Sequence, residues 1–383
     1  MHEKHAKLKS PVFGEYARIE FALLGTSCSH IRELAGHLIS RLTTSFHIGF
    51  VDADHHAPEI SQDDFLHDGV CLQLNDKISY TQITFPEKLN QFEQRNLFQA
   101  QDLVLINGNH YRASRQIVIL DPKKSLKNKI DRLTDVRLIL QTGENPVPDY
   151  LHFLREKSTP VLHISDLDAI AGFLADDLDT HAPVLNGLVL AGGKSTRMGR
   201  DKSALKYHES TQAAHVFSQL GNMCAEVFLS CNSDQRAVFT PNFPVIEDSF
   251  TGLGPLGGIL SAMQKDPNAA WLTVACDLPL LSTDTLQFLK ENRNPRSVAT
   301  AFYDAQHEFP EPLITIWEPK AYARLLLFLA QGYSCPRKAL INSDVTLLEA
   351  PDKRELMNAN HPQEYQEVME ILHSTKKPET DHV

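Results

Sequence analysis

The chain has 383 residues, of which 42% are hydrophobic and 22% charged, a composition that supports ordinary buried cores and excludes a disordered or collagen-like protein. Its length exceeds what one core usually organises, so we expect two domains. The formal net charge is −11, from 37 basic and 48 acidic residues. Because no stripe of Lys and Arg stands out, this balance argues against a nucleic-acid or membrane-surface binder.

The sequence carries no signal that places it in or across a membrane. Its longest wholly apolar run, residues 325–330, is far shorter than the roughly 20 residues of a membrane span. The basic residues 1–10 are not followed by the apolar core of a signal peptide, so we expect a cytoplasmic protein. The six cysteines are widely scattered without metal-binding spacing, which predicts free thiols.

The first half reads as strand, loop and helix in alternation. An apolar run over residues 19–24 ends at Gly25, and apolar residues then recur at helical spacing over residues 31–42. Alternating strands and helices predict a mostly parallel sheet covered by helices. Further strands are expected at residues 46–51, 103–106, 117–120, 136–140 and 161–164.

Residues 175–183 are acidic and poor in aliphatic side chains, and we interpret them as a linker between domains 1–180 and 181–383. The second domain again alternates strands with helices, so the expected fold is two three-layer α/β domains. Its predicted strands cover residues 185–190, 227–230, 244–246, 271–276, 297–302 and 313–317, and its predicted helices cover residues 211–220, 256–264, 284–291 and 362–372.

The segment 190–202 follows directly on a predicted strand and contains two adjacent glycines, Gly192 and Gly193. Glycines allow a sharp turn and bring bare backbone N–H groups against a ligand. Such a loop suits a polyphosphate rather than a solvated turn, because four cations crowd into it although the chain is acidic overall. These cations are Lys194, Arg197, Arg200 and Lys202.

Two familiar nucleotide-binding patterns nearly match in this half, and both fail. The Gly193-Lys194-Ser195 tripeptide ends like a P-loop, but the first glycine that a P-loop requires would fall at Leu188. Residues 252–257 satisfy the G-x-G-x-x-G pattern of dinucleotide-binding folds. A polar stretch separates these glycines from their strand, and a dinucleotide site leaves the basic loop unexplained.

Acidic residues follow two predicted strands of the same half. Glu247 and Asp248 end one strand and Asp277 ends another, so a parallel sheet would bring them to one edge beside the basic loop. A Mg²⁺ ion bound together with substrate phosphates needs only one or two carboxylates. A strand-end Asp is often only a helix or turn cap, but the nearby phosphate loop favours the metal.

These residues resemble a known family. Residues 190–202 resemble the signature of sugar-nucleotide-type nucleotidyltransferases, in the R-M-G-x-D-K form. In their order along the chain, the later motifs are similar to those of molybdenum cofactor guanylyltransferases of the MobA type. These motifs are Glu247-Asp-Ser, Gly254-Pro-Leu-x-Gly258, Cys276-Asp-Leu-Pro279, Glu311-Pro-Leu and Asn358-Ala-Asn-His-Pro362.

The resemblance implies transfer of GMP from GTP to molybdopterin with release of pyrophosphate and with Mg²⁺ as cofactor. It implies that Asp277 binds both GTP and Mg²⁺, that Asp248 binds the nucleoside, and that Lys202 binds phosphates. Arg197, Lys202 and Asp277 are the implied catalytic residues. The remaining implied nucleotide contacts are Leu190, Ala191, Gly192, Gly193, Lys194 and Ser230.

Two positions depart from the family pattern. Ser230 stands where family members usually carry Asn, which affects recognition of the base, and His361 replaces a Thr that would cap a helix better. Purine and pyrimidine pockets are built partly from backbone groups, so a cytidylyltransferase stays open. A sugar-phosphate nucleotidyltransferase and a non-catalytic scaffold for cofactor delivery also stay open.

The first half resembles the GTP-binding MobB-type partner of such enzymes, through residues 102–108 and 115–120. It has the layout of a P-loop NTPase, but the second glycine and the lysine are replaced by His30 and Ile31. The resemblance therefore implies an accessory domain that docks to its own other half, another copy, a molybdoenzyme or a cofactor carrier. We interpret Asp54-His55-His56 as a solvated loop rather than a metal site.

Overall fold

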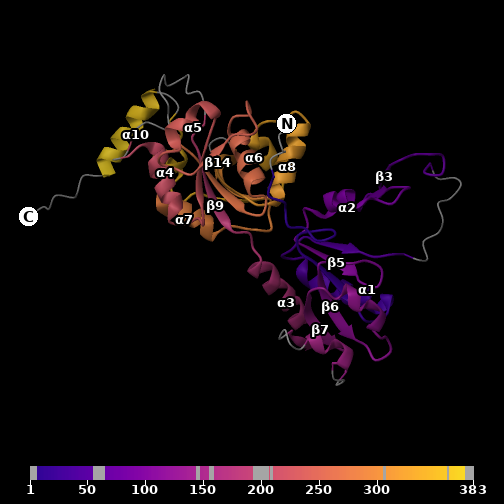
Figure 1. The fold of residues 1–383 in the computed structure, drawn as a ribbon. Helices are drawn as coiled ribbons and strands as arrows, with labels where there is room; N and C mark the ends of the chain where they lie inside the picture. Colours follow the sequence, from indigo (N-terminus) through magenta and orange to yellow (C-terminus); the bar gives the residue numbers. More distant parts are fainter. Residues whose placement is uncertain are drawn as a thin grey trace, which may run out of the picture. The chain divides into compact units, whose positions relative to one another are not determined.

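The computed structural model describes residues 7–54, 65–143, 147–154, 159–192, 207, 210–304, 308–359 and 362–375. The chain forms two compact units (Figure 1). One is Val12–His181, and the other is Ala182–Val383 together with the residues up to Pro11. This grouping differs from the predicted domain 1–180 at the amino terminus. None of the helices in the described part of the chain has both the length and the hydropathy of a membrane span.

A six-stranded sheet, in which every pairing is parallel, forms the centre of the amino-terminal unit. Its order is β2-β5-β1-β6-β7-β8. Both faces are buried, which explains why the strands are nearly continuous apolar runs. The strands are β1 (Glu20–Leu24), β2 (Ile48–Val51), β5 (Leu103–Asn107), β6 (Arg115–Leu120), β7 (Val136–Gln141) and β8 (Val161–His163).

Helices cover one face of this sheet, and short 3-10 segments lie on the other. Phe21 and Leu23 of β1 pack in one cluster with buried residues of α1 and α3, whereas Ala22 and Leu24 pack in a second cluster. The helices on the first face are α1 (Cys28–Leu42) and α3 (Leu167–Thr180). Phe98, at the end of α2 (Gln91–Phe98), packs against the second cluster, on the side of the 3-10 segments Lys127–Arg132 and Asp149–Leu154. A separate hairpin joins β3 (Gln73–Asp76) and β4 (Thr81–Thr84).

The prediction of a linker at residues 175–183 is wrong for its first part, because α3 continues to Thr180. Asp177 in this helix is buried, and its carboxylate accepts hydrogen bonds from Arg115 at 2.5 Å and Arg137 at 2.9 Å. Asp177 is therefore ion-paired within a helix rather than part of a solvated connection. The apolar residues Ile170, Leu174 and Leu178 recur at intervals of four on the buried face.

The carboxyl-terminal unit contains a seven-stranded sheet of order β11-β10-β9-β12-β14-β13-β15. Strands β9, β10, β11 and β12 are parallel, and β14 runs antiparallel to both of its neighbours. The prediction of a mostly parallel α/β sheet is confirmed. The strands are β9 (Leu185–Leu190), β10 (Val227–Cys231), β11 (Val245–Glu247), β12 (Ala270–Ala275), β13 (Ala299–Asp304), β14 (Phe309–Trp317) and β15 (Val345–Leu348).

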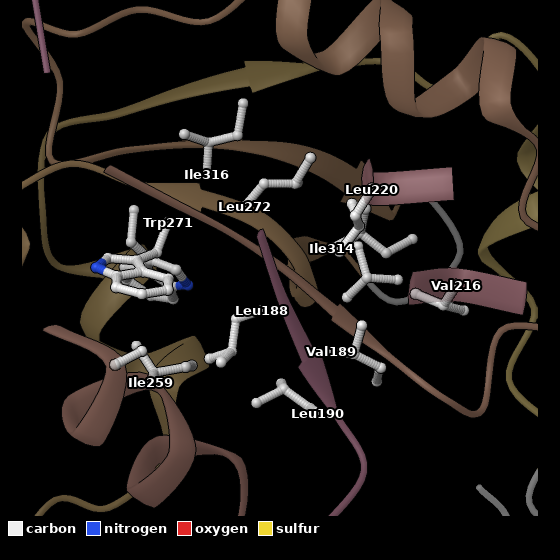
Figure 2. Close-up of a cluster of buried hydrophobic side chains, with 14 of the residues drawn as sticks. Leu188, Val189, Leu190, Val216, Leu220, Ile259, Trp271, Leu272, Ile314 and Ile316 are labelled. Atoms are coloured by element: carbon white, nitrogen blue, oxygen red, sulfur yellow. The ribbon is translucent and has the colours of Figure 1, made fainter. Parts of the chain in front are cut away.

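Strand β9 lies at the centre of the core of this unit, and its side chains alternate between the two faces. Figure 2 shows Leu188 and Leu190 near Ile259 of α6, and Val189 on the side of Val216 in α4. Each face of β9 is therefore covered by a helix. The helices are α4 (Gln212–Gly221), α5 (Ser233–Phe239), α6 (Pro255–Lys265), α7 (Thr283–Glu291), α8 (Lys320–Ala330), α9 (Pro336–Ile341) and α10 (Pro362–Thr375).

A buried ion pair connects the end of β14 to the beginning of this unit. Glu318 is fully buried, and its two carboxylate oxygens accept hydrogen bonds from Arg293 at 2.7 and 2.9 Å. Arg293 also donates to the carbonyl oxygen of Pro183 at 2.8 Å, just before β9 begins. Burial raises the pKa of Glu318, whereas the hydrogen bonds and charge of Arg293 act in the opposite direction.

Replacing Glu318 by Ala leaves the Arg293 guanidinium, whose side chain is only 13% exposed, without its carboxylate. We expect the free energy of unfolding of this unit to fall by about 3–5 kcal/mol. Tryptophan fluorescence during urea unfolding measures this change selectively, because the two tryptophans of the chain, Trp271 and Trp317, both lie in the core of this unit.

The matched control is Arg236→Ala, which removes an ion pair with Glu247 in which the Arg236 side chain is 62% exposed. Exposed pairs contribute little, so this change should lower the free energy of unfolding by less than about 1 kcal/mol. An equally small effect of Glu318→Ala would contradict a structural role for the buried pair.

Candidate functional site

The carboxyl ends of four parallel strands meet at one edge of the seven-stranded sheet. Leu190, the last residue of β9, is in register with Ser230 of β10 and with Ala275 of β12. Asp248 follows β11, the next strand outward, and Asp277 follows β12. The edge therefore brings together predicted site residues that are far apart in the sequence, as in other open parallel sheets that bind ligands.

Ser230 and Asp248 form a direct contact at this edge. The Ser230 hydroxyl, which is buried, donates a hydrogen bond to Asp248 Oδ1 at 2.7 Å. The second oxygen of this carboxylate lies beside Gly192, where an added Cβ would be 3.4 Å from Asp248 Oδ2. Burial raises the pKa of Asp248, whereas the hydrogen bond from Ser230 lowers it. Ser230 thus orients a half-buried carboxylate next to the backbone of the predicted nucleotide loop.

Helix α6 approaches the same edge closely enough to exclude any side chain at Gly258. A Cβ at this position would lie 2.3 Å from Ser230 Oγ and 3.0 Å from Leu190 Cδ2. The helix begins at Pro255 after Gly254, whose φ of 58° lies in the region that favours glycine, and no side chain caps its first turn. This packing explains why the motif carries glycine at positions 254 and 258, which the sequence pattern alone does not explain.

Asp277 contacts the backbone of the segment that contains Asn358. The backbone N–H of Ala359 donates to the Asp277 carbonyl oxygen at 2.8 Å. Among the described residues, Asn358 Oδ1 is a buried oxygen for which no hydrogen-bond donor is found. A carboxylate and an amide oxygen are ligands that suit Mg²⁺, which keeps several waters and needs few protein ligands. The residues at this position therefore fit the expected metal.

A second carboxylate, that of Glu311 on β14, lies at the same end of the sheet. Glu311 is three residues before Ile314, whose partner Val274 is three residues before Asp277 in the antiparallel register. Burial raises the pKa of Glu311, and the charges of Asp277 and Asp304 add to this effect while Arg337 opposes it.

Glu311 and Asn358 occur in two of the sequence motifs, but the motifs alone assign neither residue a role. Their place in these motifs was the only signal that could have found them. In the described ranges no cluster of three or more His, Cys, Asp or Glu side chains forms a ready metal site.

The basic part of the predicted loop lies outside the described residues. This applies to Gly193, Lys194, Arg197, Arg200 and Lys202, and also to His55, His56 and His361. Where the chain is described again, Tyr207 is buried against Tyr365 of α10, with ring centroids 5.0 Å apart. Burial raises the pKa of Tyr207 to about 12, and the charge of Asp277 contributes.

In the amino-terminal unit, the β1–α1 connection does not leave room for a phosphate-binding loop. Helix α1 begins at Cys28, only four residues after β1 ends, and Ser27 caps it. The Ser27 hydroxyl accepts from the N–H of His30, and the Ser27 carbonyl accepts from the N–H of Ile31 at 3.0 Å. Backbone donors that a P-loop would direct at phosphates are therefore used within the helix.

Comparison with known proteins identifies the carboxyl-terminal half. Residues 187–345 match the family model of the MobA-like NTP transferase domain, so the predicted resemblance of this half to MobA-type proteins is confirmed. The chain is 32% identical to a probable molybdenum cofactor guanylyltransferase from Carboxydothermus hydrogenoformans, over 48% of this chain and 94% of that protein. The resemblance of the amino-terminal half to MobB-type proteins stays a prediction.

Two further relatives match about half of the chain. A molybdenum cofactor biosynthesis bifunctional protein from Synechocystis is 32% identical over 50% of this chain, and the match spans 55% of its own length. A solved structure of molybdopterin-guanine dinucleotide biosynthesis protein A from Archaeoglobus fulgidus has 20% identity and a TM-score of 0.42. That likeness covers 49% of this chain and 99% of the other.

Gly258→Ala tests the close approach of α6 to the site. The added methyl group would overlap Ser230 Oγ, so we expect the free energy of unfolding to fall by about 1–3 kcal/mol. Ser230→Ala in the same chain should restore part of the loss, because it removes the overlapping oxygen. Gly221→Ala is the control, since a Cβ there meets no atom within 4 Å. Equal stabilities of the two glycine variants in urea unfolding would refute this packing constraint.

Proposed function

Because the chain belongs to the family of MobA-like nucleotidyltransferases, we propose that it transfers GMP from GTP to molybdopterin, forming molybdopterin guanine dinucleotide and pyrophosphate. The observation that carries this proposal is the edge at which Leu190, Ser230, Asp248 and Asp277 meet. This edge combines the backbone of Gly192 with the Asp248 carboxylate, which Ser230 orients. It also carries side-chain oxygens, on Asp277 and Asn358, of the kind that suits a hard cation. The names of the relatives supply the substrates, GTP and molybdopterin.

In this proposal the nucleoside of GTP lies between β9 and β11. The backbone from Leu190 to Gly192 contacts the nucleotide, and the Asp248 carboxylate accepts hydrogen bonds from the nucleoside. Ser230 acts through Asp248, because its hydroxyl already donates to Oδ1 and leaves Oδ2 directed toward Gly192. This arrangement supports a positioning role for Ser230.

The chemical step is an in-line displacement at phosphorus. An oxygen of the terminal phosphate of molybdopterin attacks the α-phosphorus of GTP, the bond to the bridging oxygen breaks, and pyrophosphate leaves with its electron pair. Such a reaction needs positioning and charge neutralisation rather than a covalent intermediate on the protein. Lys194, Arg197 and Lys202 would neutralise charge that develops on the leaving pyrophosphate.

Asp277 would hold Mg²⁺ through its carboxylate, and the Asn358 side-chain oxygen is suited to be a second ligand. When bound there, a Mg²⁺ ion would supply charge neutralisation for the substrate phosphates. The amino-terminal unit would then serve docking, to a molybdoenzyme or a cofactor carrier, rather than a second nucleotide reaction.

Asp277→Ala and Lys202→Ala should each lower turnover by about a hundredfold or more, which corresponds to roughly 3 kcal/mol of transition-state stabilisation. Pyrophosphate release under saturating Mg²⁺ measures the effect. Asp284→Ala, at an exposed position in the first turn of α7, is a matched control that should leave turnover unchanged. Near-normal turnover of either site variant would show that its role is assigned incorrectly.

Substrate choice is tested by incubating the full chain with Mg²⁺, molybdopterin and each nucleoside triphosphate in turn. We expect pyrophosphate release with GTP, because the match to the guanylyltransferase relative spans nearly the whole length of that protein. Release with CTP alone would identify a cytidylyltransferase instead. No release with any nucleotide would favour a scaffold for cofactor delivery.

A further inference from the structure

The amino-terminal unit contains a cavity of about 300 Å³ that includes no residue of the candidate site. Its lining comes from four separate stretches of the chain. These are the turn before β1, helix α2, the loop before β6 and the segment before β7. A volume of this size is at the lower end of the range of pockets that bind small molecules.

Three arginines from different stretches line this cavity: Arg95, Arg112 and Arg132. Among the lining residues only Glu15 is acidic, and it is exposed. Arg112 forms an ion pair with Asp131 outside the lining. Positive charges repel one another, most strongly where burial limits screening by water, so such a group is costly to assemble unless an anion offsets it.

The other two arginines are held in place by backbone carbonyls rather than by carboxylates. Arg95 donates to the Gly14 carbonyl oxygen from Nε at 3.1 Å and from Nη2 at 2.6 Å, and Arg132 donates to the Gly108 carbonyl oxygen at 2.9 Å. Neither forms an ion pair in the part of the chain that the structure describes. Burial lowers the pKa of Lys129 and the charge of Arg132 adds to this shift, so that charge acts on its surroundings.

A buried carboxylate connects two walls of the cavity. Glu20 at the start of β1 is fully buried, and its carboxylate accepts hydrogen bonds from the N–H of Glu15 at 2.8 Å and of Ser114 at 2.7 Å. A Cβ at Gly14 would overlap this carboxylate, so the turn before β1 requires glycine there. The walls are therefore fixed to the sheet before any ligand arrives, which lowers the cost of binding.

The cavity lies at the edge of the sheet opposite to the β1–α1 connection. Its lining segments precede β1, β6 and β7, which are parallel neighbours, so these segments lie at the amino ends of the strands. The β1–α1 connection follows β1 and lies at the carboxyl ends. The cavity is thus separate from the position at which a P-loop would bind phosphates.

We propose that this cavity binds a small ligand through a phosphate group, with Arg95, Arg112 and Arg132 as the cationic contacts. Guanidinium groups pair with phosphate oxygens in a bidentate manner and stay charged at physiological pH. A phosphate group presents three acceptor oxygens in different directions, whereas a carboxylate presents two in one plane, so arginines from separate stretches suit phosphate better. Ser114 and Thr134, which also line the cavity, add hydroxyl donors.

Modification of arginines by phenylglyoxal, read at each arginine by mass spectrometry, tests the proposal on the full chain with inorganic phosphate as the probe. Over roughly 0.1 to 20 mM phosphate, we expect the modification rates of Arg95 and Arg132 to fall along one saturation curve by about fivefold or more, because the rate follows the unoccupied fraction. Arg354, whose side chain is 74% exposed, should react at an unchanged rate. Phosphate bound at the basic loop is read separately, at Arg197 and Arg200, so the result is independent of the proposed reaction.

Arg95→Gln removes one contact, and phosphate should then lose most of its protection of Arg132. Arg132→Gln, with the readout at Arg95, is a second form of the same test. The matched control is Arg41→Gln, which removes an arginine of the same unit that pairs with Asp168 and does not line the cavity, and protection should be kept. Circular dichroism establishes that the variants fold.

Equal modification rates of Arg95 and Arg132 with and without phosphate in the wild-type chain would overturn the proposal. Protection of Arg132 that persists in a folded Arg95→Gln variant would also overturn it, since the two arginines would then not share a ligand. Protection by citrate but not by phosphate would contradict the phosphate assignment and identify a carboxylate ligand instead.

Discussion

The parallel register around β9 is the constraint on which the candidate site depends. Because β10 and β12 both pair in parallel with this central strand, Ser230 and Ala275 align with Leu190, and the loops that follow leave the sheet at one edge. A shift of one residue in either pairing would turn every side chain to the other face. Leu188 and Leu190 lie toward Ile259 of α6 and Val189 toward Val216 of α4, so contacts with two different helices hold the strand in this register (Figure 2).

The same edge combines carboxylates with a loop that is strongly basic in the sequence. Burial disfavours the charged form of Asp248 and of Glu311. Nearby cations or hydrogen-bond donors therefore stabilise the two carboxylates. A nucleoside hydroxyl, a metal ion or a cationic side chain would each stabilise the charged form of these carboxylates. In the proposed reaction, the acidic edge would bind a cation and the basic loop would bind the polyphosphate.

Much of the fold could be predicted from the sequence because its central strands are buried on both faces. The runs that became β1, β5 and β9 are continuously apolar, and their position between helical segments is enough to indicate parallel pairing. The hairpin strands β3 and β4 escaped prediction, since they are short, largely polar and exposed. Local composition also led to a wrong prediction for the end of α3. The sequence suggests that Asp177 is solvated, but the strands of the sheet place Arg115 and Arg137 beside its carboxylate.

The position of the strand-end carboxylates at one edge of the sheet was predictable, because Asp248 and Asp277 follow recognisable strands. The position of Asn358 near Asp277 was not, because it depends on the contact of Ala359 with Asp277, more than 80 residues earlier in the chain. The lack of space at Gly258 likewise depends on how a helix packs on β10. Such features arise from tertiary contacts that no local pattern encodes.

The grouping of the residues up to Pro11 with the carboxyl-terminal unit makes the other unit an insertion in topological terms. Lys9 forms an ion pair with Asp266 at 2.5 Å, and the Ser10 carbonyl oxygen accepts a hydrogen bond from Asn268 at 3.1 Å. The polypeptide thus enters and leaves the inserted unit through two separate connections. A single proteolytic cut after His181 would not yield an intact carboxyl-terminal unit, because the segment that completes it would remain on the other fragment.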